Sequence, residues 1–170
     1  LSNDFTLTYS KHSDMRYGEN PHQDAAAFQI PGDKSNGILN AKIHQGKKLS
    51  YNNIMDADAA LSCLKEFKST ACVIVKHANP CGVALGTNML DVYKRAFAAD
   101  SISAFGGIIA INQPCDDILA EEISKVFVEI VLAPAFTKKS LDIFSKKKNL
   151  RVLEVSNIEE REQLLEVRNI

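Results

Sequence analysis

Apolar runs alternate with amphipathic segments along most of the chain, and this alternation predicts strands that alternate with helices. Four apolar runs, mostly β-branched, have the length of buried strands, and each is followed by a polar residue or a proline. These predicted strands cover residues 71–75, 108–111, 129–133 and 151–155. The first fifty residues are rich in turn residues, and residues 25–30 are the best candidate for a strand there.

Segments with apolar residues at helical spacing lie between these strands. In residues 54–67, Ala57, Leu61 and Leu64 share one face, while Asp56 is expected to face water. Strands and helices of these lengths predict an α/β layered sheet with helices on both faces. The predicted helices and their N-terminal signals are residues 54–67 after Asn53, 88–99 after Thr87, 116–126 from Asp116, 141–146, and a last helix from the capping-box spacing of Ser156 and Glu159.

Lys76 and His77 stand where the buried run 71–75 ends. The following pair, Asn79 and Pro80, has the form of an N-cap and a first helical residue, so we expect a strand-to-helix turn here. In α/β sheets, ligands bind beyond the carboxyl ends of strands, where side chains and free helix N–H groups converge on anions. The sequence therefore predicts that Lys76 and His77 lie at a ligand-binding edge.

The chemistry of this pair has two interpretations. An imidazole can accept a proton near neutral pH, and a neighbouring ammonium can stabilise a developing oxyanion, a combination suited to acyl transfer to a weakly basic amine. In the structural alternative, Lys76 extends into water from a strand end and His77 is a hydrogen-bonded turn residue. We favour the catalytic hypothesis, because the pair joins a fully apolar strand to a Pro-Cys-Gly turn.

Two other segments are candidates for ligand binding. Arg16 could bind phosphate through its planar guanidinium and Tyr17 could stack on a heterocycle, although both could also be ordinary loop residues. The loop 101–107 ends in two adjacent glycines, which let backbone N–H groups approach a ligand closely or simply allow a tight entry to a strand. Neither segment is diagnostic alone.

Cysteine chemistry has less support. Cys81 could act as a nucleophile with His77 as its base, but a small packing residue in a turn is the favoured interpretation. A zinc deaminase would need a second cysteine where this chain has Ala84. We expect no metal site and four reduced thiols, since no CxxC pair occurs among Cys63, Cys72, Cys81 and Cys115.

Composition narrows the class of protein. The chain has 170 residues, of which 45% are hydrophobic, enough for one good core. Twenty basic residues against 21 acidic ones leave no overall field to attract nucleic acid. No apolar stretch could span a bilayer and no signal peptide is evident, so we expect a cytoplasmic protein that does not bind membranes. The chain starts at Leu1 and its last segment has no stop signal, so we expect a piece of a longer polypeptide.

Five motifs in a fixed order resemble the formyltransferase domain of the bifunctional purine biosynthesis enzymes of the PurH family. They are RYGENPHQ (16–23), GKKLSYNN (46–53), KHANPCG (76–82), SISAFGG (101–107) and Ala-Pro (133–134). The resemblance implies a cytidine-deaminase-like fold, a three-layer α/β/α sandwich with a mixed sheet. It also implies that residues 1–14 lead in from an absent cyclohydrolase domain, that 15–155 form the first of two such subdomains, and that 156–170 are a truncated segment of the second.

The family's activity is transfer of a formyl group from the co-substrate 10-formyltetrahydrofolate to the 5-amino group of AICAR, an aminoimidazole carboxamide ribonucleotide, to give FAICAR. The parent enzyme also converts FAICAR to IMP in the absent domain. By this resemblance His77 matches the proton acceptor and Lys76 the residue that stabilises the transition state. The positions that match substrate contacts, or fall in the substrate loop, are Arg16, Tyr17, Asn79, Ser103, Phe105, Gly106 and Glu129.

The family's folate contacts lie beyond the C-terminal end of this chain, and its active site forms across a homodimer interface. We therefore expect the isolated chain to be inactive. The alternative hypothesis is a noncatalytic nucleotide-binding or oligomerisation module on the same scaffold, which could lose His77 without losing its purpose. A third is a cysteine hydrolase that uses Cys81 and His77.

Overall fold

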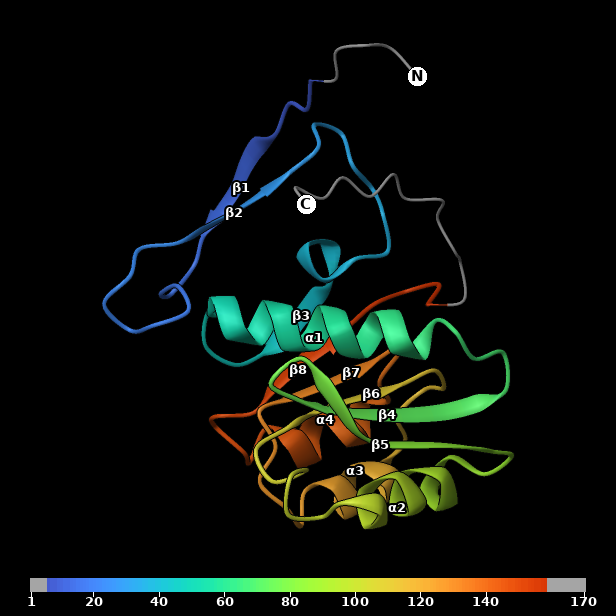
Figure 1. Cartoon of the computed structure of the whole chain (residues 1–170). Coiled ribbons are helices and arrows are strands. Elements are labelled where there is room, and N and C mark those ends of the chain that lie inside the picture. Colours follow the sequence, from blue (N-terminus) through green and yellow to red (C-terminus); the bar gives the residue numbers. More distant parts are fainter. Residues whose placement is uncertain (1–5, 159–170) are drawn as a thin grey trace.

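The protein is an α/β sandwich, described for residues 6–158 by a computed structural model (Figure 1). A six-stranded sheet has the order β3-β8-β7-β6-β4-β5, and a separate hairpin pairs β1 with β2. The strands are β1 Ser10–Asp14, β2 Ala26–Gln29, β3 Lys42–Gln45, β4 Thr70–Lys76, β5 Asn79–Gly86, β6 Ile108–Ile111, β7 Ile130–Ala133 and β8 Arg151–Glu154. The helices are the 3-10 turn η1 Ile38–Asn40 and α1 Tyr51–Leu64, α2 Met89–Ala99, α3 Asp117–Ile123 and α4 Lys138–Phe144.

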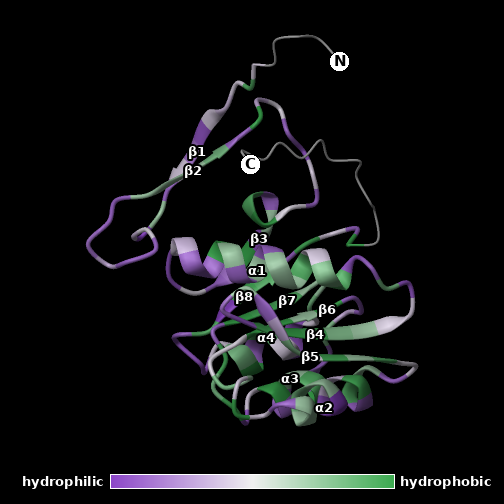
Figure 2. Cartoon of the chain, viewed as in Figure 1, coloured by the Kyte–Doolittle hydropathy of each residue, from purple (hydrophilic) through white to green (hydrophobic). Residues whose placement is uncertain are grey.

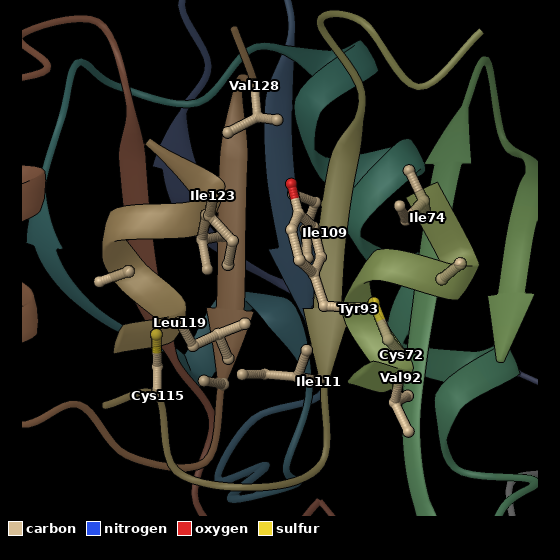
Figure 3. Packing of buried hydrophobic residues seen from close by; sticks show 14 of the residues in the cluster. Cys72, Ile74, Val92, Tyr93, Ile109, Ile111, Cys115, Leu119, Ile123 and Val128 are labelled. Carbon is tan, nitrogen blue, oxygen red and sulfur yellow. The ribbon is translucent and has the colours of Figure 1, made fainter. Parts of the chain in front are cut away.

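Helices cover both faces of the six-stranded sheet, which makes the predicted three layers. One buried cluster packs α1 against the sheet, with η1 against α1, and a second packs α2, α3 and α4 on the opposite face (Figure 1). The central strands are apolar on both faces, as Figure 2 shows, because helices exclude water from each side. Figure 3 shows the α2 and α3 side, where Tyr93 and Leu119 pack over Ile109 and Ile111.

The sheet is mixed, as expected. Strands β6, β7 and β8 run parallel to one another, whereas β4 is antiparallel to both β5 and β6, and β3 is antiparallel to β8. The amino ends of β6, β7 and β8 therefore lie beside the carboxyl end of β4. This change of direction determines which loops can meet at the end of β4.

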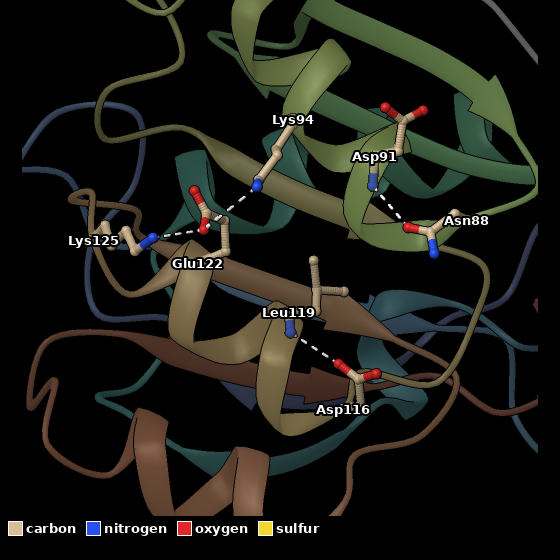
Figure 4. Close-up of polar contacts among 7 residues, drawn as sticks. All are labelled: Asn88, Asp91, Lys94, Asp116, Leu119, Glu122 and Lys125. Carbon is tan, nitrogen blue, oxygen red and sulfur yellow. Dashed lines mark hydrogen bonds and ion pairs between the residues drawn. The ribbon is translucent and has the colours of Figure 1, made fainter.

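Each α-helix begins with a side-chain cap that satisfies a free N–H group of its first turn. Ser50 and Asn53 form a reciprocal capping box on α1. Figure 4 shows two more caps, in which Asn88 accepts from the Asp91 N–H at the start of α2 and Asp116 accepts from the Leu119 N–H at the start of α3. In the same view, Glu122 of α3 joins the two helices through Lys94 of α2, and also pairs with Lys125. Thr137 caps α4.

The predicted helix at Asn79 and Pro80 is wrong: the chain turns back as strand β5 and forms a hairpin with β4. Pro80 is tolerated because β5 is an edge strand and the residue lies beside a bulge, two places where a strand accepts proline. Cys81 is the extra residue of a bulge, since the register passes from Val75 opposite Pro80 to Ile74 opposite Gly82. A Cβ at Gly82 would lie 2.0 Å from the Ala96 carbonyl oxygen, so only glycine lets α2 pack this closely.

Other boundaries differ less from the prediction. Helix α1 begins at Tyr51 with Ser50 as its cap, so Asn53 is its third residue and not its cap as predicted. Asn88, not Thr87, caps α2, and α4 begins three residues before the prediction. Strands β1 and β3 were not predicted, and the last predicted helix lies almost wholly outside the described residues. Within residues 6–158, no helix combines the length and apolarity needed to cross a membrane.

Candidate active site

A cavity of about 340 Å³ opens where the carboxyl end of β4 meets the amino ends of β6, β7 and β8. The sequence pattern predicts a site beyond the carboxyl ends of strands. Of the four strands that meet at the cavity, only β4 contributes its carboxyl end. For the parallel strands, the loops that precede them supply the walls. The lining residues are Arg16, Tyr17, Lys47, Ser50, Asn52, Asn53, Asp56, Lys76, His77, Gly106, Phe127, Glu129, Asn149 and Arg151.

Backbone hydrogen bonds assemble the walls from distant parts of the sequence. The Glu129 N–H donates to the Gly107 carbonyl, and the Arg151 N–H donates to the Glu129 carbonyl, both at 3.0 Å. These bonds align the entries of β6, β7 and β8. On the opposite wall, the Tyr51 N–H donates to the Tyr17 carbonyl at 3.2 Å, which fixes the RYG segment against the start of α1.

His77 lies in the tight turn between β4 and β5. His77 and Ala78 have positive φ angles of 51° and 58°, the geometry of a two-residue type I′ hairpin turn. This geometry favours asparagine and glycine, and in other residues the left-handed region costs about 1–2 kcal/mol each. The turn is held by side chains: the Ala78 N–H donates to Asp56 Oδ1 and Asn79 Nδ2 donates to the His77 carbonyl, each at 2.8 Å.

Lys76, the last residue of β4, is half-buried and directed by the glycine loop before β6. Its Nζ donates to the Gly106 carbonyl oxygen at 2.8 Å, which leaves two of its three N–H donors for other partners. Gly106 has a φ of 68°, and a Cβ there would lie 3.0 Å from Lys76 Nζ and 3.2 Å from Phe127 Cε1. The backbone therefore favours glycine at this position, and a larger residue would also have to displace its neighbours by a few tenths of an ångström.

The charges in the cavity favour an anionic ligand. Four basic side chains, Arg16, Lys47, Lys76 and Arg151, line it against the carboxylates of Asp56 and Glu129. Arg151 is only 7% exposed, and its Nε donates to the Lys47 carbonyl at 3.2 Å. Burial lowers the pKa of Arg151, with Glu129 opposing the change and Arg16 adding to it, yet a guanidinium keeps its charge in proteins.

Glu129 is oriented by α1. Its Oε2 accepts a hydrogen bond from Asn53 Nδ2 at 2.9 Å, and the same Asn53 side chain completes the capping box of the helix. Asn53 therefore links the start of α1 to the acidic group at the entry of β7. Because Asn53 is buried, this link fixes the carboxylate in the cavity wall.

The structure brings together six of the nine predicted site residues. Arg16, Tyr17, Lys76, His77, Gly106 and Glu129 all line the cavity. The Arg16 guanidinium also lies 5.4 Å from the centre of the Tyr17 ring.

The other three predicted residues lie outside the lining. Asn79 holds the His77 carbonyl, Ser103 donates to Asp100 Oδ2 at 2.6 Å, and Phe105 packs its ring 5.4 Å from that of Phe127. Phe105 is nevertheless 61% exposed, so the loop presents an aromatic surface to solvent.

Sequence reasoning missed several residues of the cavity. Lys47 and Asn53 fall in the GKKLSYNN motif, which carries the resemblance without any assigned role. The sequence pattern identifies Arg151 only as the start of a strand, and Asp56 only as a water-facing helix residue. The available signal was the position of Glu129 and Arg151, since each is a charged residue immediately at the entry of an apolar strand.

The cysteine alternative loses support. Cys81 is not among the cavity's lining residues, and its Sγ lies 3.5 Å from the Ile74 carbonyl oxygen as a donor. Burial raises the pKa of the Cys81 thiol, which reduces the thiolate fraction at neutral pH. No group of three metal-binding side chains gathers within residues 6–158.

The fold and the cavity define an α/β sandwich domain with a cation-lined cavity that holds an imidazole next to an ammonium group. The family model described as AICARFT/IMPCHase bienzyme matches residues 1–170, and the chain belongs to this family. The chain is 53% identical over 154 residues to the bifunctional purine biosynthesis protein PurH of Polynucleobacter asymbioticus, covering 88% of this chain and 29% of that protein. Leuconostoc citreum PurH is 49% identical over 168 residues, which cover 99% of this chain and 33% of that protein. Bacillus cereus PurH is 51% identical over 154 residues, which cover 91% of this chain and 30% of that protein.

The chain thus spans about a third of the length of these relatives. A solved structure of Acinetobacter baumannii RibD aligns with 62% of this chain and 34% of its own, at 18% identity and a TM-score of 0.44. That similarity is too low to define a common fold, so the cytidine-deaminase-like label stays a prediction.

Proposed function

We propose that this chain supplies one wall of an active site that transfers a formyl group from 10-formyltetrahydrofolate to the 5-amino group of AICAR, giving FAICAR. The observation that carries the proposal is the Lys76-His77 pair at a cation-lined cavity, in a chain of the AICARFT/IMPCHase family. The IMP cyclohydrolase activity would belong to a part of the longer polypeptide outside this chain, and residues 15–155 would be the first of two formyltransferase subdomains.

In this reaction the amine nitrogen attacks the formyl carbon and loses a proton, and the formyl oxygen carries negative charge in the tetrahedral intermediate. His77 is the proposed proton acceptor. Lys76 is the proposed partner of the oxyanion, because its ammonium is held at 2.8 Å from the Gly106 carbonyl and has two further N–H donors. The C–N bond to the folate then breaks, and the folate nitrogen takes up a proton.

The nucleotide would bind with its phosphate near the cations of the cavity. Arg16 can grip a phosphate through two parallel hydrogen bonds, and Tyr17 offers a ring for stacking. The Glu129 carboxylate, fixed by Asn53, could accept hydrogen bonds from ribose hydroxyl groups. Among the residues outside the lining, Ser103 and Phe105 are proposed to contact substrate from the rim of the cavity.

The folate contacts would come from the rest of the polypeptide, with the active site formed across a homodimer in the cytoplasm. No metal is required by this chemistry. The proposal competes with that of a noncatalytic nucleotide-binding module, for which the imidazole would be dispensable.

The decisive test is His77→Ala in the chain extended to the full length of its PurH relatives. Tetrahydrofolate formation should fall by about 10²- to 10⁴-fold, the usual contribution of a general base, with little change in AICAR affinity. His12→Ala is the matched control, because His12 lies on the separate β1 hairpin with Ser13 as its partner. Turnover of the His77 variant within threefold of the parent would refute the assignment of His77 as the proton acceptor. A parent that binds AICAR but forms no tetrahydrofolate would favour the noncatalytic module.

A further inference from the structure

We propose that Asp56 is a positioning residue that, together with Asn79, clamps the peptide unit carrying His77. The inference rests on the proposed function, in which the imidazole of His77 must meet the amine of the substrate. The peptide bond between His77 and Ala78 has two polar ends, and the structure holds both. Its carbonyl accepts from Asn79 Nδ2 and its N–H donates to Asp56 Oδ1, each at 2.8 Å.

The turn needs such a clamp because its own residues do not favour its geometry. Consecutive positive φ angles at His77 and Ala78 are typical of Asn-Gly turns, and neither residue here is asparagine or glycine. Rotation of the central peptide would take Ala78 out of the left-handed region and so relieve its part of the strain. The same rotation changes the backbone angles on either side, and so moves the imidazole relative to the cavity.

Asp56 is well placed to resist that rotation. It projects from α1, whose start is fixed by the Ser50 and Asn53 capping box and whose inner face is buried at Ala57 and Ala60. The carboxylate is thus anchored to the rigid layer that packs on β4, whereas the turn is exposed. The hydrogen bond joins residues 22 positions apart and connects the tip of the hairpin to this layer.

Asn79 acts from the other side of the same peptide. It was predicted to bind substrate, but it lies outside the cavity lining and uses its side-chain N–H on the His77 carbonyl. Asp56 holds the N–H of the peptide between His77 and Ala78, and Asn79 holds its carbonyl, so the peptide plane is fixed at both ends. A group held in this way spends little of its time in unproductive orientations, which is the requirement for efficient proton transfer.

The test compares Asp56→Ala, Asp56→Asn and Asp58→Ala in the full-length polypeptide. Asparagine retains an oxygen that can accept from the Ala78 N–H, whereas alanine removes it. Asp58→Ala deletes the same charge from an exposed position of the same helix. We expect Asp56→Ala to lower kcat by about 10- to 100-fold, as misplacement of a reacting group does, with KM for AICAR within about threefold. Asp56→Asn should recover most of the loss, and Asp58→Ala should match the parent.

A second readout does not depend on activity. Hydrogen exchange at the Ala78 amide should accelerate by about tenfold or more in Asp56→Ala but not in Asp56→Asn. Asn79→Ala should also lower kcat, as Asp56→Ala does. Unchanged exchange and kcat in Asp56→Ala would overturn the inference, as would an Asp56→Asn variant as impaired as the alanine, which would indicate a role for the charge itself. If His77→Ala were fully active, the proposed role of His77 would fail, while the exchange data would still decide whether the clamp exists.

Discussion

Gly106→Ala tests whether the glycine loop before β6 sets the position of the Lys76 ammonium. The backbone at Gly106 has a φ of 68°, so any Cβ there costs about 1–2 kcal/mol. The added methyl would also lie 3.0 Å from Lys76 Nζ, so the ammonium would have to shift by a few tenths of an ångström, which weakens its hydrogen bond to the Gly106 carbonyl. This weakening adds at most about 1.5 kcal/mol, the lower end of the range for a hydrogen bond to a charged group.

The expected destabilisation of Gly106→Ala therefore exceeds the cost of the backbone strain alone and is at most about 3.5 kcal/mol. Gly32→Ala is the matched control, because Gly32 has a φ of 80° and a Cβ added there would meet nothing within 4 Å. Gly32→Ala should lower the free energy of unfolding only by the cost of the strained backbone, about 1–2 kcal/mol. Urea unfolding of the 170-residue chain measures both values by linear extrapolation.

Activity gives the second half of the test. In the full-length polypeptide, Gly106→Ala should lower the formyl-transfer kcat by about tenfold, because the ammonium no longer meets the developing oxyanion in its original place. Gly32→Ala should leave kcat unchanged. If the two variants were equally destabilised and equally active, Gly106 would not position Lys76 and the proposed role of the loop would be refuted.

Two further predictions concern the thiol beside the turn and the chain at its present length. Cys81→Ser should keep formyl-transfer activity, and an acyl adduct on Cys81 seen by mass spectrometry would contradict this. Because burial raises the pKa of the Cys81 thiol, iodoacetamide should alkylate Cys81 more slowly than a free thiol at pH 7, and the rate should increase toward alkaline pH. The 170-residue chain alone should bind AICAR weakly, as measured by calorimetry, and should form no tetrahydrofolate, because it has no folate-binding wall to hold the formyl donor. Robust turnover would show that the folate site does not lie outside this chain.

The interior of the fold was predictable because its strands are continuous apolar runs. Strands β4, β6, β7 and β8 lie where the sequence pattern predicts them, and helix α2 was predicted to within one residue. Strand β5 was missed because Asn79 and Pro80 favour a helix start locally, whereas pairing with β4 decides the structure. Here strand pairing overrides the local helix preference of two residues, as tertiary contacts often do for short sequence motifs.

The cavity was harder to predict than the fold, because its residues are polar and come from separate loops. Lys76 and His77 were found since they interrupt an apolar strand abruptly. Asp56 and Arg151 were missed as binding or positioning candidates, because a single charge on an amphipathic helix or at a strand start usually means a solvated surface. Only the antiparallel direction of β4 relative to β6 brings strand entries to the end of β4, and no local pattern contains that information.

The route by which the cavity is closed has a consequence for the order of folding. The hairpin of β4 and β5 connects neighbours in sequence and can form early, and Asp56, which holds the turn with His77, lies only 22 positions before Ala78. The hydrogen bond from Arg151 to Lys47 instead joins residues 104 positions apart, across the pairing of β3 with β8. Closing so long a loop is slow, and during synthesis it must wait until β8 has left the ribosome. The turn with His77 is therefore expected to exist before the cationic wall that would hold the proposed substrate.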